Sequence, residues 1–245
     1  MIPKKLHYIW LGGNPLPEIA LKCMESWKKF CPDYEIVVWD ESNLNLDINA
    51  YCREAYDAKK FAFCSDVLRY DILYKHGGVY LDIDVEFVKP IDDMLNNHIF
   101  LGFESPEFVA PGLIMGAEAG SETIKTLLSE YDDEHFVLEN GKFNYKTICA
   151  RVTEYLCKNC GLVQDGSKQL LDGNIAIYPV EYFCPYNAVT RKIEITDATR
   201  SIHWFNGSWV PKPTLWKKLK DCVAKIVKKI IGEENVKKIK EKRKS

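Results

Sequence analysis

The sequence contains no run of about 18 apolar residues, which is the length that a helix needs to cross the hydrocarbon core of a bilayer. This absence excludes a membrane-spanning helix from these 245 residues. An apolar segment of the kind that a secretory signal carries is missing as well, because residues 1–5 lead directly into a predicted strand. We therefore expect the nine cysteines, which are odd in number and scattered in spacing, to stay reduced.

The sequence also lacks paired cysteine motifs at zinc-finger spacing. Cys157 and Cys160 form one CxxC inside a predicted helix, and helix packing explains them better than a metal site does. No internal repeat and no low-complexity segment precedes the C-terminal tail. Hydrophobic residues make up 47% of the chain and charged residues 28%, which is ordinary for a globular protein. The length suits one large α/β domain or two small ones.

The net charge of −2 is unevenly distributed along the chain. Residues 215–245 contain 12 Lys and Arg against 4 Asp and Glu, a balance of +8, which leaves −10 for the first 214 residues. A basic tail on an acidic body points to an anionic surface, such as a membrane or a nucleic acid, as the partner of the tail.

Apolar residues recur at helical spacing between residues 215 and 231, with lysines between them. This pattern predicts a basic amphipathic helix whose apolar side suits the plane of an anionic membrane. Packing of the helix on the protein's own body is the alternative. We divide the chain into a globular domain, residues 1–212, and this tail, residues 213–245. We expect a cytoplasmic protein attached peripherally to the inner face of the membrane, with no nucleic-acid partner.

Strand and helix patterns alternate through the first half of the chain. The expected strands are residues 5–11, 35–39, 79–85, 99–103, 113–117 and 175–178, the expected helices are residues 19–30, 58–76, 123–131 and 147–160, and residues 40–49 form an expected loop. Such alternation predicts an α/β fold with a mixed or mostly parallel sheet and helices on both faces. Ligands of such sheets bind beyond the carboxyl ends of the strands.

Asp82 and Asp84 are the most informative residues of the sequence. Alternating apolar residues around them predict a buried strand, on which side chains two residues apart point to the same side. Two such carboxylates repel each other unless a cation lies between them, and their oxygens suit Mg²⁺ or Mn²⁺. An Asp-x-Asp on a solvated loop without metal is the alternative, which the apolar neighbours disfavour.

Asp66 and Arg69 lie three residues apart in a predicted helix, hence on one face of it. They form either a surface ion pair of little consequence or a polar clamp for a hydroxylated ligand. Apolar neighbours of this pair favour the clamp.

Trp10 and His203 have two interpretations each. Trp10 is either a core residue or a flat surface for a nucleobase. His203, within an aromatic segment, is either a packed histidine or a third metal ligand beside the two carboxylates.

Several motifs in order resemble those of family 32 glycosyltransferases, which include capsular polysaccharide transferases and fungal mannosyltransferases. They are Ile2-Pro3-Lys4-Lys5-Leu6-His7-Tyr8-Ile9-Trp10, Ser26-Trp27, Pro32-Asp33-Tyr34, Ser65-Asp66-x-x-Arg69-Tyr70 and Leu73-Tyr74-x-x-Gly77-Gly78-Val79-Tyr80-Leu81-Asp82-x-Asp84. The motif set is also similar to the catalytic domains of large glucosylating bacterial toxins. The resemblance is strong over residues 2–104, appears in outline over 198–211 and is loose between them.

This resemblance implies a GT-A-type fold, a Rossmann-like mixed sheet flanked by helices, in residues 1–212, with the amphipathic helix as an appendage. It also implies a retaining, metal-dependent hexosyltransferase that uses Mn²⁺ or Mg²⁺. The donor would be a nucleotide-sugar, a UDP-sugar by analogy with the toxins. The acceptor would be a glycan or a lipid-linked glycan in the synthesis of surface polysaccharide such as capsule.

The resemblance assigns roles to individual residues. Trp10 would stack on the base, Asn43 would contact the base or ribose, and Asp66 and Arg69 would hold the sugar hydroxyls. Tyr80 and Asp82 would contact the sugar or ribose, and Asp82, Asp84 and His203 would bind the metal. Ser208 and Trp209 resemble a Ser-x-Trp closure of the toxins, although here the two residues are adjacent. The implied catalytic set is Asp66, Arg69, Asp82 and Asp84.

Retention of configuration requires either a covalent intermediate or attack of the acceptor on the face that the leaving group occupies. The sequence nominates no nucleophilic carboxylate, so we favour same-face attack. Two other functions use the same residues. Asp82-x-Asp84 fits the start of an aspartate-nucleophile phosphatase, and a non-catalytic sugar-binding module would retain the same motifs.

Overall fold

The computed structural model describes residues 1–187, 190 and 192–207. Its centre is an eight-stranded sheet with the order β2-β1-β3-β7-β5-β9-β8, and β6 pairs with β5 at one side. The strands are β1 (Lys5–Ile9), β2 (Glu35–Trp39), β3 (Gly78–Tyr80), β5 (Ile99–Ser105), β6 (Phe108–Val109), β7 (Met115–Ala117), β8 (Gln169–Leu171) and β9 (Ile175–Tyr178).

The sheet is mixed. β1 pairs in parallel with β2 and β3, and β5 pairs in parallel with β9, whereas β7 runs antiparallel to both β3 and β5. The carboxyl ends of β1, β3 and β5 therefore lie at the same edge of the sheet, which is where ligands of open α/β sheets bind.

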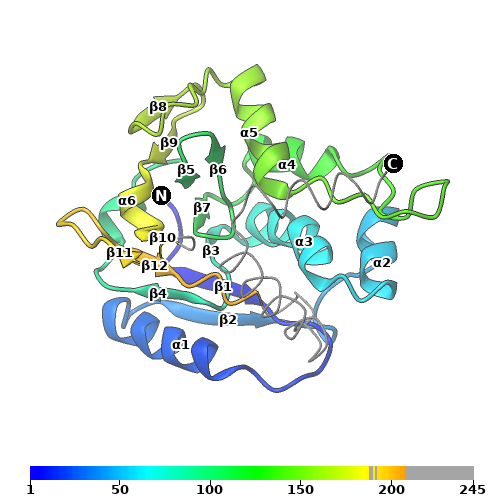
Figure 1. The fold of residues 1–245 in the computed structure, drawn as a ribbon, viewed down its shortest axis with the longest axis horizontal. Coiled ribbons are helices and arrows are strands. Elements are labelled where there is room, and N and C mark those ends of the chain that lie inside the picture. The colour runs from blue at the N-terminus through cyan, green and yellow to red at the C-terminus, as the bar shows by residue number, and fades with distance from the viewer. Residues whose placement is uncertain (188–189, 191, 208–245) are drawn as a thin grey trace, which may run out of the picture. The chain divides into compact units, whose positions relative to one another are not determined.

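Helices cover both faces of the sheet (Figure 1). They are α1 (Glu18–Phe30), α2 (Ala50–Asp57), α3 (Phe61–His76), α4 (Glu122–Ser129), α5 (Ile148–Asn159) and the short α6 (Val180–Phe183). One core cluster joins α2, α3, α4 and α5 to one face of the sheet, and the other joins α1 and α6 to the opposite face. Burial on two faces explains why the central strands read as continuous apolar runs.

The alternation of side chains along β5 shows how the sheet separates these two cores. Ile99, Leu101 and Phe103 belong to the cluster under α3, whereas Phe100 belongs to the cluster over α1. This follows from the two-residue period of a strand.

Two shorter sheets lie outside the main one. β4 (Val85–Phe87) pairs antiparallel with β12 (Ser201–His203), and β10 (Tyr186–Asn187) pairs antiparallel with β11 (Lys192–Ile193). A 3₁₀ turn, η1 (Asp92–Met94), follows β4. The pairing of β4 with β12 joins the middle of the chain to the end of its described part.

The fold class is confirmed: the chain forms a Rossmann-like mixed sheet flanked by helices. The expected strand over residues 79–85 is wrong in one respect, because β3 ends at Tyr80 and a turn separates it from β4. All the apolar residues of that segment are buried as expected, but burial alone does not distinguish one strand from two. The helix expected over residues 58–76 begins at Phe61, and α2 was not expected. The predicted C-terminal helix lies outside the described residues.

The cysteines of the described residues are all free, and their reduced state stays a prediction. Cys157 and Cys160 pack at the end of α5 against the core under α3. Over the part of the chain that the structure describes, none of the helices combines the length and the apolarity needed to span a bilayer.

His7 on β1 is a buried residue that ties neighbouring strands together. Its Nε2 lies 2.8 Å from the Gly77 carbonyl oxygen, and Trp39 donates its indole N–H to His7 Nδ1 at 3.0 Å. Nε2 therefore carries the proton, because Nδ1 must accept. Burial lowers the pKa of His7 to about 4 against the opposing effect of the Gly77 contact.

This buried imidazole makes stability depend on pH. An unfolded chain binds a proton at His7 below about pH 6.5, whereas the folded chain binds it only near pH 4, so stability falls as the pH drops through this window. We predict that the free energy of unfolding of the wild-type protein falls by about 3 kcal/mol between pH 6.5 and pH 4 because His7 takes up a proton on unfolding. The variant His7→Gln should be less stable at pH 7. Its free energy of unfolding, measured with urea, should depend less steeply on pH between 6.5 and 4, by the contribution of about one bound proton. An equally steep loss in the variant would contradict the assignment.

Candidate active site

The turn between β3 and β4 carries Asp82 and Asp84. It is closed by a hydrogen bond from the Val85 N–H to the Asp82 carbonyl, 3.2 Å, and is anchored at both ends. The Asp82 N–H donates to the Gly112 carbonyl at 3.0 Å, and Trp27 of α1 donates its indole N–H to the Val85 carbonyl at 2.7 Å. The turn is thus held between the β6–β7 loop and α1, with both carboxylates beyond the carboxyl end of β3.

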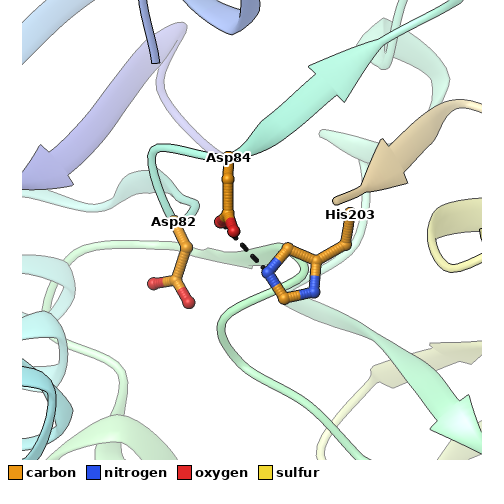
Figure 2. Close-up of side chains that lie close together, drawn as sticks. All are labelled: Asp82, Asp84 and His203. Atoms are coloured by element: carbon orange, nitrogen blue, oxygen red, sulfur yellow. Dashed lines mark hydrogen bonds and ion pairs between the residues drawn. The ribbon is translucent and has the colours of Figure 1, made fainter. Parts of the chain in front are cut away.

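β12 brings His203 to these carboxylates. In the β4–β12 ladder His203 pairs with Val85, the residue after Asp84. One ligand atom from each of Asp82, Asp84 and His203 lies within 4.8 Å of the others, and no other such cluster occurs within the described ranges. Figure 2 shows the three side chains meeting in one space, Asp82 and Asp84 from the turn and His203 from β12.

Asp84 is held in its ionised form by two hydrogen bonds. His203 Nε2 lies 3.1 Å from Asp84 Oδ1, and the Asn206 N–H donates to Oδ2 at 2.7 Å. Burial opposes ionisation of this carboxyl, but the contacts with His203 and Asn206 outweigh it and lower the pKa of Asp84. Burial also opposes protonation of His203, yet its hydrogen bond with Asp84 raises the pKa of the imidazole.

Asp82 is more open than Asp84, since 36% of its side chain is exposed. The Tyr80 hydroxyl donates to Asp82 Oδ1 at 3.2 Å, and Arg69 Nη1 lies 3.7 Å from the same oxygen. Burial of the carboxyl and repulsion by Asp84 raise the pKa of Asp82, although Arg69 acts in the opposite direction. A divalent cation between Asp82 and Asp84 would remove this repulsion.

Asp66 and Arg69 form a buried pair, so the surface ion pair considered from the sequence is excluded. Arg69 Nη2 donates to Asp66 Oδ1 at 2.8 Å, and both residues are less than a tenth exposed. Arg69 Nη1 is buried beside Asp82 and has no hydrogen-bond partner among the described residues. Burial raises the pKa of Asp66 to about 7 despite the neighbouring guanidinium. Charged groups buried with spare hydrogen-bonding capacity are typical of ligand sites.

The donor set fits a divalent metal ion. Carboxylates of Asp82 and Asp84 are ligands that Mn²⁺ and Mg²⁺ prefer, and an imidazole such as that of His203 suits Mn²⁺ better than Mg²⁺. His203 Nδ1 is buried and has no hydrogen-bond partner among the described residues. The imidazole is oriented by its hydrogen bond with Asp84 and by the Phe205 ring, whose centroid lies 4.2 Å from that of the imidazole.

The remaining predicted site residues are distributed as follows. Trp10 follows β1, packs partly into the core over α1 and donates its indole N–H to the Asn14 carbonyl at 2.6 Å. Asn43 closes the turn after β2, where its amide contacts the Asp40 N–H and the Val38 carbonyl. Tyr80 is buried, and the Arg69 guanidinium carbon lies over its ring, 4.5 Å from the ring centre. Their nucleotide contacts stay predictions, and Ser208 and Trp209 lie outside the described residues.

Three residues that the sequence analysis did not consider belong to the site. Gly112 supports Asp82, because a Cβ at this position would overlap the Asp82 carboxylate and approach Arg69 Nη1. Burial raises the pKa of Glu104, at the end of β5, although the nearby Cys149 thiol of α5 and the His203 imidazole act in the opposite direction. Glu104 follows an apolar run of residues, as Asp82 does, so the sequence pattern could have identified it. Nothing in the sequence indicates Cys149.

Residues 17–101 match the model of the glycosyltransferase sugar-binding region that contains the DXD motif. The match includes Asp66, Arg69, Asp82 and Asp84 and leaves out Trp10 and His203. The matched region includes the DXD aspartates at the carboxyl end of β3. The expected resemblance to family 32 glycosyltransferases is confirmed.

Fungal proteins are similar to about half of the chain. An inositol phosphoceramide mannosyltransferase of Schizosaccharomyces pombe is 32% identical over 123 residues, which are 49% of this chain and 34% of that protein. An initiation-specific α-1,6-mannosyltransferase of Candida albicans is 30% identical over 127 residues, 48% of this chain and 32% of that protein. The chain thus spans about a third of the length of these relatives. The solved structure of the PaToxG glycosyltransferase aligns at a TM-score of 0.48 and 19% identity, covering 64% of this chain and 69% of that one.

Gly112 provides a test of how Asp82 is positioned. We predict that Gly112→Ala lowers the affinity for Mn²⁺ roughly tenfold, the effect of losing a supporting contact of a metal ligand, because the new methyl group displaces the carboxylate. Isothermal titration calorimetry with Mn²⁺ measures it. The same substitution in an Asp82→Ala background should have no further effect. An additive loss in the double variant would show that Gly112 acts by another route.

Proposed function

We propose that this chain is a metal-dependent hexosyltransferase that moves a sugar from a nucleoside diphosphate to a hydroxyl acceptor. One observation carries the proposal: Asp82, Asp84 and His203 gather within 4.8 Å of one another beside the buried Asp66–Arg69 pair. A cation site next to a buried acceptor–donor pair matches the two halves of such a donor, a diphosphate and a hydroxylated ring.

Each half of the site has a distinct task. Asp82 and Asp84, with His203, would hold Mn²⁺ or Mg²⁺, which when bound neutralises the charge of a departing diphosphate. Asp66 can accept hydrogen bonds from sugar hydroxyls when ionised, and the unpartnered Arg69 Nη1 can donate one to a sugar or phosphate oxygen. The Tyr80 hydroxyl donates a hydrogen bond to Asp82 and so fixes the orientation of that carboxylate.

The chemistry of glycosyl transfer sets what this arrangement must stabilise. The bond between the sugar and the diphosphate breaks with positive charge building on the ring and negative charge on the leaving oxygen. Groups already oriented by the fold stabilise such charges without reorganising during the reaction. We infer same-face attack by the acceptor and hence retention of configuration, because none of the residues in the motifs is placed as an obvious covalent nucleophile.

The substrate class follows from the relatives and the resemblance. The two fungal relatives named above are mannosyltransferases; one name includes a lipid, inositol phosphoceramide, and the other an α-1,6 linkage. We propose a hexose donor, with UDP expected from the toxin resemblance, and a glycan or lipid-linked acceptor of surface polysaccharide synthesis. A thermal-shift screen of UDP- and GDP-hexoses with Mn²⁺ would identify the donor, since a ligand of the native state raises its melting temperature.

Asp84 is the residue on which the metal proposal depends. We predict that Asp84→Asn lowers Mn²⁺-dependent hydrolysis or transfer of the nucleotide-sugar at least about a hundredfold and weakens Mn²⁺ binding, with the fold intact by circular dichroism. The matched control is Glu86→Gln on β4, whose carboxylate contacts Trp204 and Lys22 instead. Near-normal turnover of Asp84→Asn would remove the metal hypothesis. Cleavage of p-nitrophenyl phosphate by the wild type would favour a phosphatase.

The basic tail leads to a proposal about location. We propose that residues 215–231 attach the protein to the inner face of the membrane, close to a lipid-linked acceptor. We predict that the full chain sediments with vesicles of phosphatidylglycerol and that deletion of residues 215–245 abolishes this binding. Raising the salt concentration should weaken it, because lysines contribute through charge. Equal sedimentation of the full and shortened chains would contradict the proposal.

A further inference from the structure

Phe205, just after β12, has a backbone conformation that an aromatic residue seldom adopts. Its φ is +48°, in the left-handed region where the Cβ of any residue other than glycine is crowded. Two other non-glycine residues of the described ranges have a positive φ, and each has a local reason for it. Lys59 follows the end of α2, where left-handed residues are common, and Asn174 is of a type that tolerates the conformation. Phe205 has neither reason, so contacts of its neighbours must hold it in this conformation.

The backbone on either side of Phe205 is bound to Asp84. The Trp204 N–H donates to the Asp84 carbonyl at 3.0 Å, and the Asn206 N–H donates to Asp84 Oδ2 at 2.7 Å. If the register of the β4–β12 ladder continued past its end, Asn206 would lie opposite Asp82 instead. The left-handed conformation of Phe205 therefore ends the ladder and directs the Asn206 N–H to the Asp84 carboxylate.

The side chain of Phe205 contacts the other member of the pair, His203. The centroids of the two rings lie 4.2 Å apart with an angle of 55° between the ring planes, and the Tyr186 ring of β10 lies 6.4 Å from the Phe205 ring. Phe205 is 39% exposed, so burial in the core does not explain its position. A ring packed against the imidazole restricts its rotation, which a metal ligand requires.

Cation binding changes which contacts can orient the imidazole. His203 Nε2 faces Asp84 Oδ1 at 3.1 Å (Figure 2). An imidazole that binds a cation through this nitrogen uses its lone pair and has no proton there to donate to Asp84. The contact with the Phe205 ring does not depend on that proton and persists. The ring is thus placed to orient His203 in the form in which it acts as a ligand.

We propose that Phe205 is a positioning residue that sets the preference of the cation site for Mn²⁺ over Mg²⁺. This inference rests on the proposed metal-dependent function. The backbone of Phe205 directs the Asn206 N–H to Asp84, which supports either ion because a carboxylate suits both. The ring of Phe205 orients the His203 imidazole, which suits Mn²⁺ better than Mg²⁺. The backbone thus acts on the affinity for both ions, and the ring acts on the selectivity between them.

Metal binding without turnover tests the role of the ring. Electron paramagnetic resonance measures free Mn²⁺ in a titration of the full chain with UDP present, and competition by Mg²⁺ gives the second affinity. Phe205→Leu removes the ring, so the affinity for Mn²⁺ should fall about tenfold while that for Mg²⁺ changes less than about twofold. A general loss of structure would lower both affinities and leave their ratio unchanged. The matched control is Phe108→Leu on β6, because Phe108 is 41% exposed, and it should keep the wild-type ratio.

A second pair of variants tests the backbone of Phe205. Phe205→Gly and Phe205→Val both lack the ring, but glycine adopts a positive φ freely whereas the β-branched valine resists it. Phe205→Gly should therefore bind both ions like Phe205→Leu or more tightly. Phe205→Val should bind both Mn²⁺ and Mg²⁺ at least about threefold more weakly than Phe205→Gly, because the Asn206 N–H is turned away from Asp84. Melting temperatures without metal check that each variant is folded.

The outcomes separate this inference from the proposed function. If folded Phe205→Leu keeps the wild-type ratio of the two affinities, or Phe108→Leu loses it equally, the ring does not set the selectivity and the transferase proposal stands. Equal affinities of Phe205→Gly and Phe205→Val would show that the left-handed backbone has no role. A wild type that binds Mn²⁺ no better than Mg²⁺ would also overturn the inference. If the wild type binds neither ion with UDP or GDP present, the proposed function fails and this role of Phe205 fails with it.

Discussion

The antiparallel pairing of β4 with β12 is the interaction on which the candidate site depends. It places His203 beside Asp84, 119 residues earlier in the chain, where the two side chains hydrogen-bond. The same connection places the Asn206 N–H on the second oxygen of Asp84. Without this strand pairing, the two carboxylates would still be neighbours, but no contact would hold the imidazole beside them. The site is thus a product of long-range pairing as well as of a short motif.

Burial gives the site its electrostatic character. Asp66 and Arg69 lie almost completely inside the protein, and Asp82 has one face open to a ligand. Burial raises the pKa of both Asp66 and Asp82, whereas hydrogen bonds lower the pKa of Asp84. Neighbouring carboxyls with opposed shifts indicate different tasks, one group kept ionised and others sensitive to a bound cation or sugar. Gly112 maintains this arrangement by leaving space for Asp82.

Much of the fold could be predicted because the strands and helices carry clear periodicity. α5 was expected within a residue at each end, since Thr147 caps its start and accepts from the Ala150 N–H. The break between β3 and β4 was missed because both sides of it are buried and apolar, so no polar residue other than the aspartates marks the turn. β12 was missed because three residues are too few to show a period, and its stability comes from pairing with β4.

The sequence by itself determined the class of the protein. Local spacing is enough to place Asp66 and Arg69 on one helix face and to set Asp82 beside Asp84, and the ordered motifs resemble those of family 32 glycosyltransferases. Only the tertiary structure decided that Arg69 reaches Asp82 and that Gly112 underlies the carboxylate. The physical reason is that these contacts join separate strands and helices, whose relative positions follow from the sheet order and the packing of two cores and are not written in any local pattern.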